Sequence, residues 1–285
     1  MNVLIIPNLT KNNAQLHTVR VVNQLRQYGA SVTMKAEHQD DFPGCPITFA
    51  QDFFLALQEC DVVLAIGGDG TIIHAAKHAA MTNKPVLGIN VGRLGFVAGL
   101  EVDELEKLEN LVEGNYALEE RMMLQVSLNQ SEELRTFYAL NDAVISRGSL
   151  SRILDLKVLF NHSNMCDYRA DGLIFATPTG STAYSLSAGG PVIDPSMNCI
   201  LLSPICPHSL FTRTVVFGED AKLEVLPSRD SESEIFLTID GETAVPVGDR
   251  CPIRISRAAY TAQIIKLKPS NFYEVVNEKL AERRP

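Results

Sequence analysis

The stretch Asp61-Val-Val-Leu-Ala-Ile-Gly-Gly-Asp-Gly-Thr71 decides the fold of the first part of the chain. Residues 62–66 are all apolar, which predicts a strand covered on both faces, as in a parallel sheet. Three glycines follow within four residues, and the next ten residues are rich in helix formers. The first N–H groups of a helix have no partner inside it and form a favourable site for phosphate. The stretch therefore predicts a phosphate-binding turn at the C-terminal end of a parallel strand.

One acidic residue, Asp69, stands inside this turn. Aspartate is a favoured N-cap residue and in that role stabilises a helix by about 1 kcal/mol. The alternative is proton chemistry with a cation close by, because a carboxylate would otherwise repel a bound phosphate. The pentapeptide alone leaves both interpretations open. The glycines Gly67, Gly68 and Gly70 permit unusual backbone conformations and close approach of a ligand. The turn matches neither a P-loop nor a Gly-x-Gly-x-x-Gly fingerprint.

Composition narrows the class of protein. The chain has 285 residues, 46% of them hydrophobic, and a net charge of −9 without any basic run, which argues against a nucleic-acid partner. No apolar run approaches 18 residues, so no membrane span is expected. The six cysteines are scattered, without a Cys-x-x-Cys pair. We therefore expect free thiols in a cytoplasmic protein and no zinc site.

Two textures divide the chain. Strand and helix patterns alternate over residues 1–116 and predict an α/β domain with a Rossmann-like parallel sheet. Within it, residues 47–59 are predicted to form one amphipathic helix. Residues 117–267 consist of short β-rich segments separated by turn residues, which predict an all-β, sandwich-like domain. The last segment, 268–285, is predicted to be helical and to pack back onto the first domain.

The segment 168–191 is dense in hydroxyl-bearing and small residues, and Tyr184 stands among them. Such a composition suits a wall that hydrogen-bonds a polar aromatic ligand such as adenine. The alternative is a Ser/Thr-rich connecting loop. No Gly-x-Ser-x-Gly elbow is present, so a serine hydrolase is excluded.

Three smaller patterns are ambiguous. His74 and His78 are four residues apart and share one helix face. They fit ordinary surface histidines or one histidine near a phosphate. A zinc-binding pair is less favoured, because Ala75 stands where a metalloprotease has glutamate. Asn141-Asp142 fits a turn and equally fits a pair that contacts ribose hydroxyls. The segment 240–242, Asp-Gly-Glu, predicts an ordinary hairpin turn.

Taken in order, these segments resemble the NAD kinase family of ATP-dependent enzymes. The segments that carry the resemblance are 67–71, 88–96 (Gly-Ile-Asn-Val-Gly-Arg-Leu-Gly-Phe), 141–142, 168–172, 177–191 and 203–208. The glycine turn is shared with diacylglycerol, sphingosine and 6-phosphofructokinase relatives, and the string at 177–191 separates the chain from those.

The resemblance implies two domains with the substrate between them, and it implies site residues. Asp69 matches the proposed general base. The implied ATP phosphate site comprises Gly67, Gly68, Gly70, Thr71 and His74. The implied dinucleotide site comprises Asp69, Gly70, Phe96, Asn141, Asp142, Arg169, Asp171, Thr182, Ala183, Tyr184, Ser185, Leu186, Ser187, Cys206, His208 and Glu242. Among these, Tyr184 is expected beside the adenine, and Cys206 and His208 in a loop that crosses between subunits.

The implied reaction phosphorylates the 2′-hydroxyl of the adenosine ribose of NAD, with ATP as donor and Mg²⁺ carried by ATP rather than by a metal site of the chain. The resemblance also implies a homo-oligomer, a dimer or a tetramer, with sites near the subunit interface. A nonenzymatic dinucleotide sensor and a lipid kinase are the rival interpretations. The intact Asp69 turn argues against the first, and the hydroxyl-rich segment against the second. NADH as acceptor, polyphosphate as donor and feedback by NADP stay open.

Overall fold

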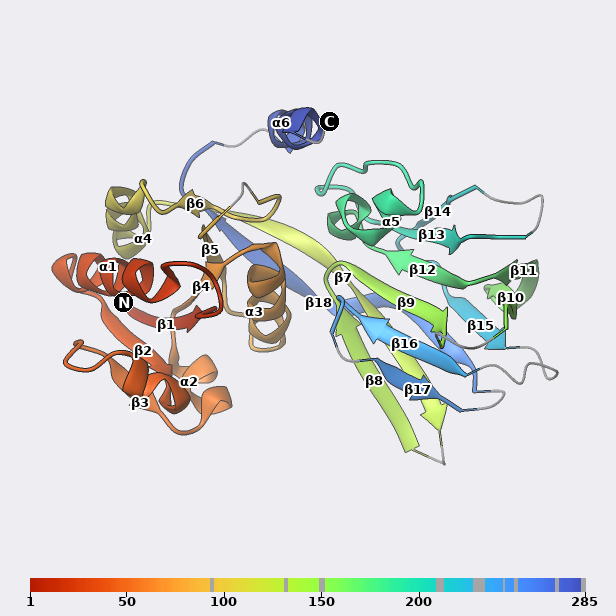
Figure 1. The fold of residues 1–285 in the computed structure, drawn as a ribbon, viewed down its shortest axis with the longest axis horizontal. Helices are drawn as coiled ribbons and strands as arrows, with labels where there is room; N and C mark the ends of the chain where they lie inside the picture. The colour runs from red at the N-terminus through yellow and green to blue at the C-terminus, as the bar shows by residue number, and fades with distance from the viewer. Residues whose placement is uncertain are drawn as a thin grey trace. The chain divides into compact units, whose positions relative to one another are not determined.

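The computed structural model describes residues 1–92, 95–130, 133–148, 152–208, 213–227, 234–242, 244–248, 251–269 and 272–282. The chain divides into two compact units (Figure 1). The first unit comprises Met1–Glu120 together with Ala262–Pro285, so it includes both ends of the chain. The second unit comprises Arg121–Thr261. None of the helices in the described part of the chain is long and apolar enough to cross a membrane.

A parallel sheet forms the centre of the first unit, with strand order β3-β2-β1-β4-β5. Its strands are β1 (Asn2–Pro7), β2 (Ser31–Lys35), β3 (Thr48–Ala50), β4 (Val62–Gly67), β5 (Val86–Asn90) and the short β6 (Leu100–Glu101). The helical segments are α1 (Ala14–Gln27), η1 (Ala36–Asp41), α2 (Phe53–Glu59), α3 (Asp69–Met81), η2 (Leu105–Lys107), α4 (Leu108–Glu113) and α6 (Phe272–Glu282). Strand β4 is buried at every position, as its unbroken apolar sequence predicts.

Helices cover both faces of this sheet. On one face α1 and α4 pack together against the strands (Figure 1). Their shared core includes Val22, Leu25 and Leu108. On the other face α3 packs directly on β4 and β5. Ile72 of α3 lies against Gly88, where an added Cβ would come within 2.5 Å of its side chain. Helix α3 is thus held tightly to the sheet, which fixes the turn that precedes it.

The prediction of one helix over residues 47–59 is wrong. The structure has a short strand, β3, followed by α2. Strand β3 pairs in parallel with β2, from Thr33 opposite Thr48 onwards. Helix α2 begins after Asp52, whose carboxylate accepts a hydrogen bond from the N–H of Leu55 at 3.1 Å. The N-cap at Asp52 marks the true start of the helix, and sheet pairing accounts for the residues before it.

The second unit contains antiparallel strands whose side chains share one core. One group of strands follows the order β14-β13-β12-β9-β16-β17, and another contains β11-β10-β15 next to β18, with β7 and β8 paired. The strands are β7 (Ala117–Gln130), β8 (Glu133–Ala139), β9 (Asp142–Arg147), β10 (Leu154–Phe160), β11 (Ser163–Ala170), β12 (Gly172–Ala176), β13 (Cys199–Ile205), β14 (Val215–Gly218), β15 (Leu223–Pro227), β16 (Ile235–Ile239), β17 (Val245–Val247) and β18 (Ile253–Lys266). Two short helical segments, η3 (Thr179–Thr182) and α5 (Tyr184–Ser187), follow β12.

The core of this unit draws from strands of both groups, for example Val126, Phe175 and Ile253. Two sheets with one shared core form a sandwich. The predicted combination of an α/β domain and an all-β, sandwich-like domain is therefore confirmed. The sequence does not predict strand β11, because its first two residues, Ser163 and Asn164, are polar and exposed, and no alternation of buried and exposed residues begins before Asp167. It is paired to β10 through a tight turn at Asn161 and His162, both with positive φ.

Candidate active site

The Asp69 side chain does not cap its own helix. The N-cap of α3 is Gly68, and no side chain caps this helix end. Instead, the Asp69 carboxylate accepts hydrogen bonds from the backbone N–H of Phe96 at 2.9 Å and of Val97 at 3.2 Å. The capping interpretation of Asp69 is therefore wrong. The carboxylate is oriented by a loop that follows the neighbouring strand β5.

This loop needs a glycine at one position. A Cβ added at Gly95 would lie 2.3 Å from Oδ1 of Asp69, closer than any side chain tolerates. The absence of a side chain at Gly95 allows the loop to close over the carboxylate. A cation of the chain also reaches the same group, since Nζ of Lys279 in α6 lies 3.3 Å from Oδ2 of Asp69. Neither contact has a local signal in the sequence, because both partners lie far along the chain from Asp69.

The glycine turn has the geometry expected of an anion site. Gly68 is extended, and a Cβ there or at Gly70 would meet nothing within 4 Å, so the space beside both residues is open. Gly67 serves packing instead, because its Cβ would lie 2.4 Å from the hydroxyl of Thr71. That hydroxyl accepts a hydrogen bond from the side-chain amide of Asn8 at 3.0 Å. Gly67, Gly68 and Gly70 could adopt unusual backbone conformations, but none of the three has a positive φ.

His74 lies on the exposed side of α3, and its ring packs edge-to-face on His78 at 4.7 Å between centroids. His78 in turn contacts Phe53 and Phe54 of α2. Within the described ranges no three His, Cys, Asp or Glu side chains are grouped so as to hold a metal ion.

In the second unit, the side chain of Asp240 holds the turn at Asn141 and Asp142, although the sequence predicts only an ordinary turn residue at position 240. Asp240 accepts hydrogen bonds from three consecutive backbone N–H groups, those of Leu140 at 3.0 Å, Asn141 at 2.7 Å and Asp142 at 3.0 Å. Asp240 and Gly241 both have positive φ, so the predicted turn is confirmed. Its aspartate has the further role of fixing the 141–142 turn.

The hydroxyl-rich segment packs against the same turn. The hydroxyl of Thr177 donates to the carbonyl of Leu140 at 2.5 Å and accepts from the N–H of Gly180 at 3.1 Å. A Cβ at Gly180 would lie 2.0 Å from the carbonyl oxygen of Asn141, so only glycine fits there. The start of the segment 177–187 and the 141–142 turn, which are far apart in sequence, therefore lie side by side.

A cavity of about 380 Å³ opens where these segments meet. Its lining includes four predicted site residues, Asn141, Asp142, Ala183 and Tyr184, together with Asp240. The pKa of Asp142 is raised from its ordinary 3.8 to about 7. Burial of the carboxyl group is the main cause, and the nearby charge of Asp240 adds to it, while a hydrogen bond from the N–H of Tyr184 acts in the opposite direction. Asp142 can therefore be protonated near neutral pH and donate a hydrogen bond into the cavity.

Other residues of the wall differ in what their side chains do. The hydroxyl of Ser185 is buried and hydrogen-bonded to the hydroxyl of Ser203 at 2.9 Å. The hydroxyl of Ser203 is also hydrogen-bonded to that of Thr214 at 2.9 Å. Ser185 therefore stabilises the segment from its buried side. Thr182 donates to the carbonyl of Thr179 at 3.3 Å. Leu186 is half-buried, and Ser187 is exposed like Tyr184.

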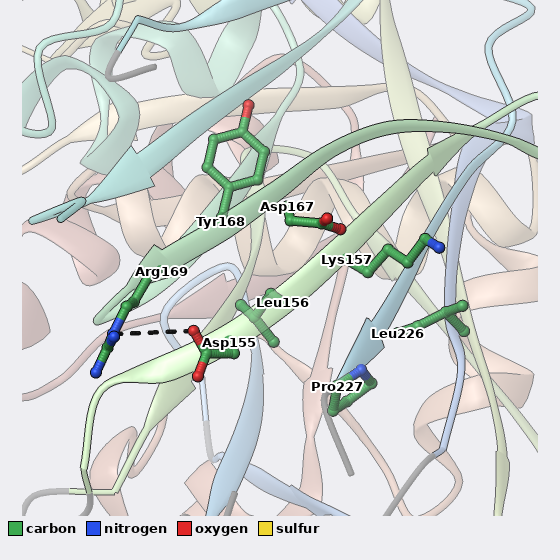
Figure 2. A pocket seen from close by; sticks show the side chains of 8 residues that line it. All are labelled: Asp155, Leu156, Lys157, Asp167, Tyr168, Arg169, Leu226 and Pro227. Atoms are coloured by element: carbon green, nitrogen blue, oxygen red, sulfur yellow. Dashed lines mark ion pairs between the residues drawn. The ribbon is translucent and has the colours of Figure 1, made fainter. Parts of the chain in front are cut away.

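The remaining predicted residues lie outside this cavity. Asp171 forms an ion pair with Arg147 at 2.7 Å. Figure 2 shows Arg169 on β11 across from Asp155 on β10, beside a cavity of about 420 Å³. Their closest charged atoms are 3.9 Å apart and both side chains are mostly exposed, so this pair holds Arg169 weakly.

The segment after β13 is tied to Arg169 as well. The backbone N–H of His208 donates to the carbonyl of Arg169 at 2.7 Å, and the preceding Cys206 is exposed, with a φ of 44°. Glu242 is exposed in the turn after β16, where its N–H donates to the carbonyl of Ile239 at 2.9 Å.

Comparisons with known proteins identify the family. Residues 3–116 match the model of the ATP-NAD kinase N-terminal domain, and residues 140–267 match that of the ATP-NAD kinase C-terminal domain. An NAD kinase of Symbiobacterium thermophilum is 45% identical over 225 residues, covering 78% of this chain and 79% of the relative. An NAD kinase of Moorella thermoacetica is 39% identical, covering 97% and 88%.

A solved structure agrees with these relatives. The crystal structure of yeast NADH kinase complexed with NADH superposes with a TM-score of 0.90 at 25% identity, covering 100% of this chain and 89% of that chain. The two units and their motifs define a nucleotide-dependent kinase fold. The chain belongs to the NAD kinase family, an ATP-dependent family of kinases, and the resemblance seen in the sequence is confirmed.

The raised pKa of Asp142 predicts a pH dependence of stability. The folded protein holds the Asp142 proton up to about pH 7, whereas the unfolded chain releases it near pH 3.8. The free energy of unfolding therefore decreases as the pH rises between these two values, because the folded protein keeps a proton that the unfolded chain has released. Asp142→Asn cannot ionise, so its melting temperature is expected to rise relative to wild type between about pH 4 and about pH 7.

The difference in melting temperature between variant and wild type isolates this group, because other groups titrate in both proteins. Asp167→Asn, which changes an exposed carboxylate of the same unit, serves as the control for the removal of one charge. A constant difference for Asp142→Asn would contradict the prediction.

Proposed function

We propose that this protein transfers the γ-phosphate of ATP to the 2′-hydroxyl of the adenosine ribose of NAD, with Asp69 as the general base. The observation that carries the proposal is the orientation of Asp69 by the amides of Phe96 and Val97 instead of by its own helix. A carboxylate that only capped α3 would not need a second loop to hold it. The NAD kinase relatives and the NADH-bound yeast structure support the choice of acceptor.

The proposed reaction needs only the two substrates and the Asp69 carboxylate for its bond changes. The 2′-hydroxyl loses its proton to the Asp69 carboxylate as its oxygen attacks the γ-phosphorus. The bond between that phosphorus and the β–γ bridging oxygen breaks, and ADP leaves. Proton removal by a placed base typically contributes about 10²–10⁴-fold to such a step. The rest of the rate enhancement comes from positioning and charge neutralisation.

The Gly68–Gly70 turn and the first N–H groups of α3 are suited to receive the phosphates, beside the open space found at both glycines. A divalent cation is general in ATP-dependent kinases, and we assign Mg²⁺ to the ATP substrate. Magnesium is commonly held by substrate phosphates with few protein ligands. When bound, the ion neutralises phosphate charge.

For the dinucleotide we assign the cavity at Asn141, Asp142, Ala183 and Tyr184 in the second unit. A neutral Asp142 can donate to an ether or hydroxyl oxygen, and the exposed Tyr184 ring offers a surface on which a base can stack. The remaining residues of the dinucleotide site named from the resemblance are proposed on that resemblance alone.

Asp69→Asn is expected to lower kcat for NADP formation by about 10²-fold or more, because the amide cannot accept the hydroxyl proton. The NH₂ group of the new asparagine side chain also faces one backbone N–H of the 95–97 loop. We therefore expect the free energy of unfolding to fall by about 1 kcal/mol in addition to the kinetic effect. Formation of NADP from Mg-ATP and NAD, calorimetric NAD binding and thermal melting are measured together.

Asp61→Asn is the matched control, since Asp61, at the opposite end of β4 from Asp69, also accepts a hydrogen bond from a backbone N–H, that of Asn2. It should keep wild-type kcat. Near-normal turnover by Asp69→Asn would rule out the general base, and no NADP from the wild-type protein would rule out the proposed reaction. Lipid acceptors, NADH and polyphosphate are tested in the same assay.

Gly95→Ala is expected to lower kcat by about tenfold to a hundredfold, because the new methyl group displaces the Asp69 carboxylate and small misplacements are costly in phosphoryl transfer. Gly218→Ala is the control, since a Cβ there meets nothing within 4 Å. Equal kcat values for both variants would contradict the role given to the 95–97 loop.

We also propose that the protein is a homo-oligomer in which the loop with Cys206 and His208 reaches a neighbouring subunit. The resemblance to the family supports this assembly. Light scattering coupled to gel filtration is expected to give the mass of a dimer or tetramer, and a monomer at micromolar concentration would contradict it.

A further inference from the structure

The C-terminal helix α6 supplies a positive charge to the Asp69 carboxylate. Nζ of Lys279 lies 3.3 Å from Oδ2 of Asp69 and 3.8 Å from the centroid of the Phe96 ring. Phe96 therefore holds both partners, since its backbone N–H donates to the same Oδ2 at 2.9 Å. The three residues belong to the first unit although 210 residues separate Asp69 from Lys279.

Burial distinguishes this ion pair from an ordinary surface pair. The side chains of Lys279 and Asp69 are 19% and 26% exposed. The aromatic face of Phe96 offers the ammonium group a second favourable contact, which keeps it in place. Lys279 is thus positioned before any substrate arrives.

The contacts also distinguish the two oxygens of the carboxylate. A carboxylate offers about four acceptor positions, two on each oxygen. Among the described residues, Phe96 and Lys279 donate to Oδ2, and Val97 donates to Oδ1. Within the described residues Oδ1 thus carries one contact fewer than Oδ2, and we therefore assign the substrate hydroxyl to Oδ1.

A charge argument gives the lysine a role in the reaction. Asp69 and Lys279 together are neutral, so a triphosphate that approaches them meets less repulsion than it would from an isolated carboxylate. Once Asp69 has taken the hydroxyl proton, the pair carries one positive charge. That charge appears while the negative phosphoryl group is being transferred nearby, when a fixed cation stabilises it most.

We propose that Lys279 is a positioning residue of the phosphoryl-transfer site, which fixes Asp69 with Oδ1 towards the acceptor hydroxyl and balances its charge against the triphosphate. This inference rests on the proposed function of Asp69 as the base. It assigns to the C-terminal helix a part in the reaction, beyond packing on the first unit.

The test compares Lys279→Met, Lys279→Arg and Glu278→Gln, the last changing an exposed charge at the next position of the same helix. Lys279→Met is expected to lower kcat by about tenfold to a hundredfold, with the KM for NAD within about twofold of wild type. Lys279→Arg keeps the charge and is expected to recover most of kcat. Glu278→Gln should equal wild type.

A double-mutant cycle tests whether the lysine acts through Asp69. In the Asp69→Asn background, Lys279→Met should change the residual rate by less than about twofold. A full additive loss in that background would overturn the proposal. So would a kcat of Lys279→Met within twofold of wild type, and in that case NADP formation by wild type and its loss in Asp69→Asn would leave the proposed function intact.

Hydrogen exchange supplies a readout without turnover. Exchange in α6 is expected to accelerate in both Asp69→Asn and Lys279→Met, and to stay at the wild-type rate in Glu278→Gln. Unchanged exchange in the first two variants would overturn the contact itself, whatever reaction the protein catalyses.

Discussion

The hydrogen bonds from the backbone of residues 96 and 97 to the Asp69 carboxylate are the interaction on which the site depends. They form because β4 and β5 are adjacent parallel strands, with Gly67 opposite Asn90 and the N–H of Val91 bonded to the carbonyl of Gly67 at 3.0 Å. Parallel neighbours release their following loops at the same edge of a sheet. The turn after β4 and the loop after β5 therefore meet.

The sequence predicts those parts of the site that are specified locally. An apolar strand, a glycine turn and a helix follow one another within twenty residues, and each is determined by its own pattern. The partners of Asp69 are not specified in this way. The amides lie 27 and 28 residues away and Lys279 lies 210 away, so only the tertiary fold brings them together. The local sequence is compatible with Asp69 as the cap of its own helix, but the long-range contacts show that its carboxylate binds another loop.

The second unit shows the same division between local and distant information. The sequence predicts a turn at Asp240-Gly241, and the positive φ of both residues explains the pattern. It does not predict that the Asp240 carboxylate gathers three amides about 100 residues earlier in the chain. Gly180 behaves similarly, because its need for a bare Cα arises from the carbonyl of Asn141. The fold class can be predicted because periodicity is a local property. The helix predicted over residues 47–59 is confirmed only for Phe53–Glu59, because pairing with β2 makes Thr48–Ala50 a strand.

Two aspartates thus stand in opposite environments. Asp69 is surrounded by donors, two amides and an ammonium group, which hold its carboxylate in one orientation. Asp142 is buried next to the carboxylate of Asp240, and its pKa of about 7 lets it act as a donor. In the proposed function Asp69 is the base for a hydroxyl group and Asp142 is the neutral acid that binds ligand oxygens, which are different tasks. The fold separates them by giving one carboxylate cationic and N–H neighbours and the other an acidic neighbour and little water.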